Sequence, residues 1–226
     1  MLWVDKYRPT SLQELDYHDA ITKRLTALAE SPADLPHLLF YGPSGAGKRT
    51  RINALLNALF GPSSQKLKLD KRTFTTPTGR LVEIHMIASP HHVEFSPGDA
   101  GNNDRYVIQD VLKEMASTKN VRSIQETMAE GKGKGKDSHD NNNNNKTNNV
   151  SHKNELKVVV LTQVDRLSKQ AQAALRRTME KYAAACRLVL CCNSPSKLIG
   201  PLRSRCLGIR VAAPTTDQVR MKLVFL

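Results

Sequence analysis

The stretch LLFYGPSGAGKR, residues 38–49, decides the fold. Its first four residues, Leu38–Tyr41, are typical of a short buried strand, which Gly42-Pro43 ends. The loop that follows has the pattern G-x-x-x-x-G-K, in which backbone N–H groups wrap a phosphate and the Lys reaches the outer phosphates. A helix pattern begins directly after the loop and adds a partial positive charge at its N-terminus. Because strand, loop and helix follow in this order, we favour a phosphate-binding loop over a simple Gly/Pro turn.

The residue after the loop departs from this motif. Arg49 stands where the motif requires Ser or Thr, whose hydroxyl group ligates Mg²⁺. Thr50 lies one residue further, about 100° around the helix, and is not expected to replace that hydroxyl. We therefore predict that the loop binds ATP or ADP but that Mg²⁺ coordination at this position is impaired. The residues expected to contact the nucleotide here are Gly42, Pro43, Ser44, Gly45, Ala46, Gly47, Lys48, Arg49 and Thr50.

Further strand and helix patterns alternate along the chain. Strands are predicted over Leu38–Tyr41, Val82–Ile87, Val158–Leu161 and Arg187–Cys192, and helices over Asp19–Ala29, Lys48–Phe60, Asp104–Ala116 and Lys169–Tyr182. Strands that alternate with helices of this length indicate βαβ units, and so an α/β fold with a mostly parallel sheet. In such sheets ligands bind beyond the carboxyl ends of the strands, which is where the phosphate loop falls.

A second part of the nucleotide site is expected after the apolar run Val158–Leu161. Sites of this class carry an Asp-Glu pair there: the Asp supports Mg²⁺ and the Glu activates water. Thr162 and Gln163 follow the run instead, and Gln163, at the position of the catalytic base, can orient a water but cannot accept its proton. We expect bound nucleotide with weak hydrolysis and assign no metal ligand. An alternative register, in which Asp165 is the metal ligand, stays open.

The charge of the chain favours a polyanionic partner. The 226 residues include 34 basic and 21 acidic side chains, a formal charge of +13. The segment 131–154 holds five Lys, two Asp and eight Asn but a single aliphatic residue, so we expect a disordered insertion that contributes +3. The remaining +10 fits nucleic acid, although a basic surface alone is a weak signal.

Composition also excludes several classes of protein. No run approaches the ~18 apolar residues that a membrane helix needs, and the charged N-terminus lacks the apolar core of a secretory signal. The four cysteines show no C-x-x-C spacing, and two of them lie inside an apolar run. We expect buried thiols in a reducing compartment, not a zinc site or a disulfide framework.

Four segments in this order resemble the small subunits of replication factor C, the eukaryotic AAA+ clamp loader. They are WVDKYRP (3–9), GPSGAGK (42–48), ALRRTME (174–180) and SRC (204–206). The resemblance covers residues 1 to about 215, apart from the insertion. It implies an AAA+ P-loop domain over 1–212 and the start of a helical lid over 213–226, with the chain truncated before the full lid and the collar. The degenerate Mg²⁺ and base positions are similar to those of the small-subunit type with a weakened ATPase site.

The resemblance also assigns roles to residues outside the loop. It places Val4, Tyr7, Arg8 and Pro9 around the adenine. It makes Asn193, after the last predicted strand, the sensor 1 residue near the terminal phosphate. It makes Arg205 an arginine finger supplied in trans to a neighbouring subunit, and such a finger is worth about 10³–10⁵ in rate because it stabilises charge on the phosphate oxygens in the transition state.

Two further basic residues match family positions that contact DNA. Arg105 lies in the first turn of the helix predicted over Asp104–Ala116, and Lys197 follows Ser194 and Pro195, which are typical N-cap and N1 residues. A cation at a helix N-terminus opposes the helix dipole, which is consistent with an anion bound there. Contacts of this kind would be made to phosphate and be indifferent to sequence. Ordinary solvated charge is the alternative.

The implied function is that of a nuclear clamp-loader subunit in DNA replication and repair. The resemblance implies a hetero-pentamer with other replication factor C subunits, the sliding clamp and primer-template DNA as partners, no membrane contact, and an ATPase activity that belongs to the complex. Two alternatives stay open. One is a truncated, non-enzymatic interaction fragment. The other is a self-sufficient AAA+ ATPase of another replication or repair pathway, which requires the Asp165 register.

Overall fold

The computed structural model describes residues 6–76, 79, 81–115, 156–183 and 185–224. The predicted adenine contact Val4, the predicted insertion over 131–154 and the last residue of the helix predicted to end at Ala116 lie outside the described residues.

Seven strands within the described residues form one sheet, in the order β2-β3-β4-β5-β6-β1-β7. The strands β4, β5, β6, β1 and β7 are parallel to one another, whereas β2 and β3 pair antiparallel at one edge. The predicted α/β fold with a mostly parallel sheet is confirmed. The bounds are β1 (Leu38–Tyr41), β2 (Lys68–Thr75), β3 (Leu81–Ala88), β4 (His92–Phe95), β5 (Lys157–Leu161), β6 (Cys186–Cys192) and β7 (Leu207–Arg210).

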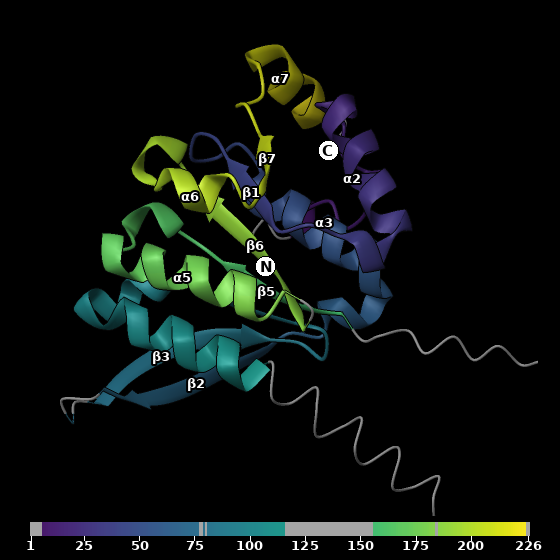
Figure 1. Cartoon of the computed structure of the whole chain (residues 1–226). Helices are drawn as coiled ribbons and strands as arrows, with labels where there is room; N and C mark the ends of the chain where they lie inside the picture. Colours follow the sequence, from purple (N-terminus) through teal and green to yellow (C-terminus); the bar gives the residue numbers. More distant parts are fainter. Residues whose placement is uncertain (1–5, 77–78, 80, 116–155, 184, 225–226) are drawn as a thin grey trace, which may run out of the picture.

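Helices cover both faces of this sheet (Figure 1). Helices α2 and α3 lie on one face, and the helix over 104–115 lies with α5 and α6 on the other. The bounds are α2 (Asp19–Glu30), α3 (Lys48–Phe60), α5 (Lys169–Lys181), α6 (Gly200–Arg203) and α7 (Thr216–Val224), with short 3₁₀ turns η1 (Pro32–Asp34), η2 (Gly61–Gln65), η3 (Pro97–Asn103), η4 (Val164–Arg166) and η5 (Pro195–Lys197). Among the described residues, no helix is both long and apolar enough to cross a membrane.

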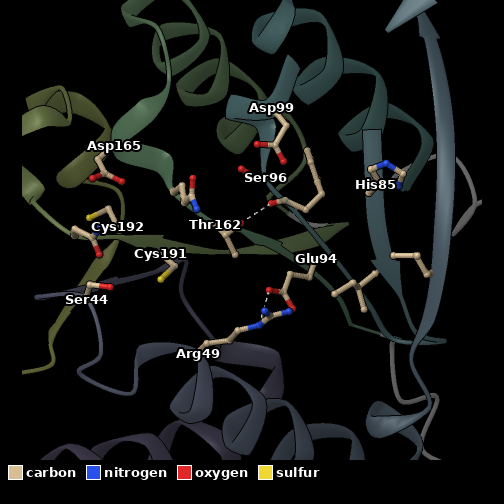
Figure 2. Close-up of a pocket in the computed structure, with 15 residues that line it drawn as sticks. Ser44, Arg49, His85, Glu94, Ser96, Asp99, Thr162, Asp165, Cys191 and Cys192 are labelled. Carbon is tan, nitrogen blue, oxygen red and sulfur yellow. Dashed lines mark hydrogen bonds and ion pairs between the residues drawn. The ribbon is translucent and has the colours of Figure 1, made fainter. Parts of the chain in front are cut away.

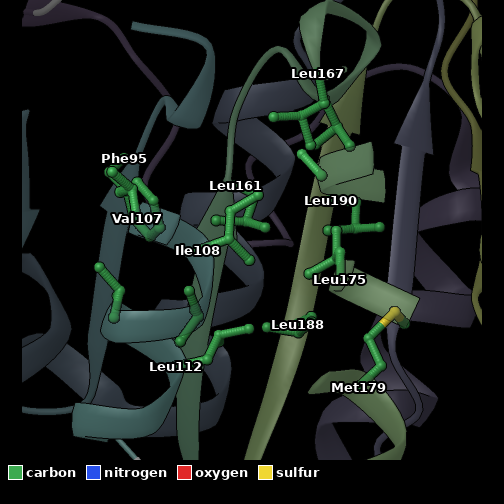
Figure 3. Packing of buried hydrophobic residues seen from close by; sticks show 14 of the residues in the cluster. Phe95, Val107, Ile108, Leu112, Leu161, Leu167, Leu175, Met179, Leu188 and Leu190 are labelled. Atoms are coloured by element: carbon green, nitrogen blue, oxygen red, sulfur yellow. The ribbon is translucent and has the colours of Figure 1, made fainter. Parts of the chain in front are cut away.

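The core is divided by the sheet into two layers. In β5, Val158 and Val160 pack on the side of α2 and α3, while Val159 and Leu161 pack against the helices of the other side, because successive strand residues point to opposite faces. Figure 3 shows the second layer, in which Leu161 lies near residues of the 104–115 helix. A strand buried on both faces explains the unbroken apolar run.

All four cysteines carry free thiols, as expected from their sequence context. Cys186 and Cys192 are buried, and Cys191 and Cys206 are half-buried. Burial raises the pKa of Cys191 to about 11 and the pKa values of Cys192 and Cys206 to about 12. Protonated thiols of this kind are poor nucleophiles, so they act as core residues.

Candidate nucleotide-binding site

The loop between β1 and α3 has the left-handed backbone that only glycine adopts easily. Gly42 and Gly47 have φ angles of 152° and 76°. A Cβ atom at Gly42 would lie 1.9 Å from the backbone oxygen of Val211, and one at Gly47 would lie 2.4 Å from the Tyr17 hydroxyl. Gly47 is the N-cap of α3, and as a glycine it has no side chain with which to cap the helix. The backbone N–H groups of the first turn are thus oriented toward the loop, as in anion sites at helix N-termini.

Lys48 brings together the loop and the end of β6. Its Nζ donates to the carbonyl oxygens of Gly42 and Pro43, at 2.7 and 2.8 Å, and to Oδ1 of Asn193 at 3.0 Å. The lysine is buried, whereas Asn193 is exposed. Two residues 145 positions apart in sequence, the expected phosphate lysine and the expected sensor 1, therefore meet at the carboxyl edge of the sheet. Of the other loop residues, Pro43, Ser44 and Gly45 are exposed, Ala46 is buried and Thr50 is half-buried.

Arg49 forms an ion pair that the sequence did not suggest. Its Nε lies 3.0 Å from Oε1 of Glu94, on β4. The Glu94 side chain is 9% exposed and that of Arg49 is 53% exposed. A buried carboxylate is costly unless a cation pairs with it. Glu94 was missed because the four residues of β4, His-Val-Glu-Phe, do not have the pattern of a buried strand.

A cleft of about 480 Å³ opens over the ends of β4, β5 and β6 (Figure 2). Ser44, Arg49, Gln163 and Asn193 are the predicted site residues that line it. Figure 2 shows Arg49 extending from α3 toward Glu94, with Thr162 between this pair and Asp99. The further polar residues of the lining are His85, Glu94, Ser96, Asp99, Thr162 and Asp165.

The end of β5 carries Thr162 and Gln163, as the favoured register expects. Thr162 donates to the carbonyl oxygen of Phe95 from its backbone N–H, at 3.0 Å, and from Oγ1, at 3.3 Å. Gln163 is exposed with a φ angle of 51°, and its Oε1 accepts from Arg166 at 2.7 Å. Asp165 also lines the cleft, so the alternative register stays open.

The predicted adenine residues Tyr7, Arg8 and Pro9 do not belong to the cleft lining. They precede Thr10, whose carbonyl oxygen accepts from Asn57 Nδ2 on α3 at 3.0 Å. The N-terminal segment thus contacts α3 at Thr10, and the assignment of these three residues to the adenine stays a prediction.

Tyr17 reaches the loop, and no sequence motif had marked it. Its hydroxyl donates to the carbonyl oxygen of Ala46 at 3.3 Å, and its ring lies 4.4 Å from the guanidinium carbon of Arg51. Arg51 is fully buried and donates to the Tyr17 carbonyl oxygen at 2.5 Å, while its Nε and Nη1 have no hydrogen-bond partner in the described part of the chain. The residue after Tyr17, His18, lies 3.2 Å from the carbonyl oxygen of Ala212 through Nε2. These contacts connect the chain before α2 with the loop and with the segment after β7.

Arg205, the expected arginine finger, is not among the residues that line this cleft. Its Nε and Nη2 are 2.8 and 2.5 Å from Oε1 of Glu180, and its Nη1 donates to the carbonyl oxygen of Pro201 at 2.6 Å. Arg176 approaches the same Glu180 oxygen at 3.9 Å. The guanidinium group is therefore fixed by two groups, although its side chain is one-third exposed.

Of the two predicted DNA residues, Arg105 lies at a helix start and Lys197 ends the 3₁₀ turn η5, and hydrogen bonds join both segments to the start of α5. Arg105, exposed, follows the buried Asp104, whose carboxylate accepts from the backbone N–H and hydroxyl of Ser168 at 2.8 and 3.0 Å. Gln172, one turn into α5, donates to the carbonyl oxygen of the exposed Lys197 at 3.3 Å. Lys197 belongs to a 3₁₀ turn of three residues, too short for an appreciable dipole, so the helix-dipole argument holds for Arg105 alone.

Sequence comparison identifies relatives over nearly the whole chain. A sequence model of the family described as "DNA polymerase III, delta subunit" matches residues 17–215. The chain is similar to a probable replication factor C subunit 3 of Dictyostelium discoideum, at 46% identity over 99% of this chain and 56% of the relative. It is also similar to replication factor C subunit 3 of Homo sapiens (48%, 96% and 53%) and subunit 5 of Saccharomyces cerevisiae (44%, 96% and 55%). The chain spans about half the length of these curated relatives.

Solved structures support the fold alone. A RuvB structure of Thermotoga maritima matches 95% of this chain and 51% of its own at a TM-score of 0.55 and 16% identity. The C. elegans PCH-2 structure matches 91% of this chain and 47% of its own at a TM-score of 0.51 and 13% identity. At such low identity the likeness concerns the arrangement of the strands and helices.

Proposed function

This chain belongs to the clamp-loader family that includes the DNA polymerase III delta subunit and the replication factor C subunits, and from that premise we propose that it is a clamp-loader subunit with a static nucleotide site. It binds ATP or ADP, hydrolyses it weakly and supplies Arg205 to a neighbouring subunit. Its partners are other replication factor C subunits in a hetero-pentamer, the sliding clamp and primer-template DNA. The complex acts in the nucleus, in DNA replication and repair.

The observation that carries nucleotide binding is the position of Lys48. The loop carbonyls of Gly42 and Pro43 hold its ammonium group at the mouth of the loop, together with Asn193. A phosphate group that enters the loop meets this ammonium and the backbone N–H groups at the start of α3 together. Asn193 is hydrogen-bonded to the same ammonium group, so a terminal phosphate bound by Lys48 would also lie close to Asn193.

The residues around the cleft do not fit an Mg²⁺ ion held in the usual manner. Arg49 replaces the hydroxyl ligand, Thr162 and Gln163 replace the two carboxylates, and the nearby Glu94 is already paired with Arg49. Gln163 cannot accept a proton from water, so the chain's own site lacks a general base there. These substitutions favour retention of the nucleotide over its turnover.

Arg205 fits the role of an arginine finger because its guanidinium is positioned before any partner binds. Glu180 and the Pro201 carbonyl fix three of its nitrogens outside the chain's own cleft. A fixed fork loses less side-chain entropy when it meets the phosphate oxygens of a neighbour. Arg105 and Lys197 would then follow the DNA backbone without reading its sequence.

One observation favours a second function. Asp165 lines the cleft, so a carboxylate is available to a self-sufficient ATPase of another replication or repair pathway. Such an enzyme turns over without partners, whereas the clamp-loader subunit does not. Steady-state ATP hydrolysis by the isolated chain separates the two functions.

Nucleotide binding is tested by titrating the chain with a fluorescent ATP analogue. The Lys48→Ala variant is expected to bind at least about tenfold more weakly, because the charge at the phosphates is lost. Lys23→Ala, which removes an exposed lysine of α2, is the matched control and is expected to bind as the wild type does. Equal affinities of Lys48→Ala and the wild type would contradict the proposal.

A further inference from the structure

Arg49 is the second residue of α3, directly beside the phosphate lysine. A nucleotide site of this class has a hydroxyl group here, and the hydroxyl holds a divalent cation against the phosphates. In this chain the position carries a cation of its own, on a side chain that lines the same cleft as Ser44 and Asn193. Positive charge is thus present at the place where a metal ion would supply it.

The ion pair with Glu94 determines where that charge lies. Arg49 approaches the nearly buried carboxylate through Nε, at 3.0 Å, and its side chain lines the cleft and is more than half exposed. Figure 2 shows the guanidinium held at the side of the cleft opposite Asp99 and Asp165. Glu94 is on β4, whose backbone is fixed by pairing with β3 and β5, so it is a rigid support.

The chemistry of the guanidinium group suits this position. It is planar and permanently charged, and it donates through a fork that matches two oxygens of a phosphate. In the observed pair Nε is directed at Glu94, which leaves the two Nη groups as donors for an anion in the cleft. A divalent cation at the same place would be repelled by Arg49 at close range.

The remaining carboxylates do not form a metal site. Asp99 and Asp165 come from the separate turns η3 and η4, and among the described residues no three His, Cys, Asp or Glu side chains come together as a metal would require. The third carboxylate of the lining, Glu94, is paired with Arg49.

We propose that Arg49, held by Glu94, takes the place of the divalent cation, so that this chain binds a nucleoside di- or triphosphate without a metal ion. The inference rests on the proposed nucleotide site. It adds that the phosphates are neutralised by Lys48 and Arg49 together, and that Glu94 is the residue that positions Arg49.

The test is an equilibrium titration of the whole chain with a ribose-labelled fluorescent ATP analogue, in excess Mg²⁺ and in excess EDTA. The wild-type dissociation constant is expected to change by less than about threefold between the two buffers. Arg49→Thr, which restores a hydroxyl, is expected to bind at least about tenfold more weakly in EDTA than in Mg²⁺. Arg24→Thr, an exposed helix arginine of α2, is the control and should behave as the wild type.

A second variant at position 49 keeps the inference testable if Arg49→Thr fails to fold. Arg49→Gln keeps a long polar side chain without the charge and is expected to lose at least about tenfold in affinity in EDTA. Circular dichroism spectra identify the variants that are folded.

Three results would overturn the inference. Wild-type binding that falls more than about tenfold in EDTA would show that a metal is needed and would leave the proposed nucleotide site intact. Arg49→Gln binding as tightly as the wild type in EDTA would show that Arg49 does not bind the phosphates. No saturable binding in either buffer would overturn the nucleotide site and the inference together.

Discussion

At the scale of single residues, the site is built from side chains that are distant in sequence. Lys48 meets Asn193, and Arg49 meets Glu94, at the carboxyl edge of the sheet. Both contacts join the start of α3 to a strand end, so they fix the cleft before a ligand binds. Pre-positioned charges of this kind lower the cost of ordering on binding.

His92 gives the chain a pH dependence of stability that can be measured. This buried residue at the start of β4 has its pKa lowered to about 4, first by burial and then by repulsion from His91. The unfolded chain binds the proton near pH 6.5 and the folded chain does not, so His92 favours the folded state fully above pH 6.5 and progressively less down to about pH 4. We expect about 2 kcal/mol of stability to be lost from this residue between pH 7 and pH 5.

Urea unfolding at the two pH values measures this loss. His92→Asn removes the titrating group and should flatten the dependence, whereas the exposed His85→Asn should leave it unchanged. An equal slope for His92→Asn and the wild type would assign the pH dependence to other groups.

The sequence predicted the residues of the site whose chemistry follows a motif, and missed those whose role depends on packing. The glycines and Lys48 follow a motif, and Asn193 was assigned from family resemblance. Glu94 and Tyr17 carry no local signal, because their importance comes from Arg49 and from the loop carbonyl that lie beside them in space. A departure from a motif, such as Arg49, is a sign that a compensating partner exists nearby.

At the scale of elements, the start of α5 holds the second helical layer together. Ser168 caps this helix by accepting from the backbone N–H of Ala171 at 3.1 Å, and it bonds to Asp104 at the start of the neighbouring helix. Two helix starts are thus joined through one hydroxyl and one carboxylate. Arg105, one of the expected DNA contacts, is presented by the same junction.

Removal of the Ser168 cap should lower the free energy of unfolding of the chain. Ser168→Ala is expected to lower the free energy of unfolding by about 1–2 kcal/mol, because the cap and the bond to buried Asp104 are both lost. Thr26→Ala, which removes an exposed hydroxyl in the middle of α2, should change it by less than about 0.5 kcal/mol. Urea unfolding measures both, and equal effects of the two variants would refute the role of the junction.

The elements that the sequence predicted are those with a strong periodic or apolar signal. The strands β1, β5 and β6 are buried on both faces and appear as apolar runs. By contrast, β2 is an exposed edge strand in which four of eight residues are charged, and β4 and β7 have only four residues each. Sheet pairing, which is not visible in a local pattern, makes them strands.

At the scale of the whole molecule, the carboxyl edge of the sheet carries the nucleotide cleft, while Arg105 and Lys197 lie on two segments that hydrogen-bond to the start of α5. If both residues neutralise phosphates of a duplex, the affinity of the assembled complex for primer-template DNA should fall as salt rises. Each of Arg105→Ala and Lys197→Ala should reduce the slope of log K against log salt by about 1.

Fluorescence anisotropy of labelled primer-template DNA, measured over a series of salt concentrations, gives these slopes. Lys181→Ala, an exposed lysine at the end of α5, is the control that should leave the slope unchanged. Unchanged slopes for both test variants would mean that the two residues are ordinary solvated charges.

In the proposed complex this chain lends Arg205 to a neighbour while its own site stays static. This division of roles is tested most directly by the DNA-stimulated ATP hydrolysis of the reconstituted complex, with Arg205→Ala compared with Arg203→Ala, an exposed arginine two residues away. We expect Arg203→Ala to have no effect and Arg205→Ala to lower hydrolysis at the neighbouring site by about 10³-fold or more. Wild-type rates with Arg205→Ala, in a complex that contains this chain in full amount, would contradict the proposed role.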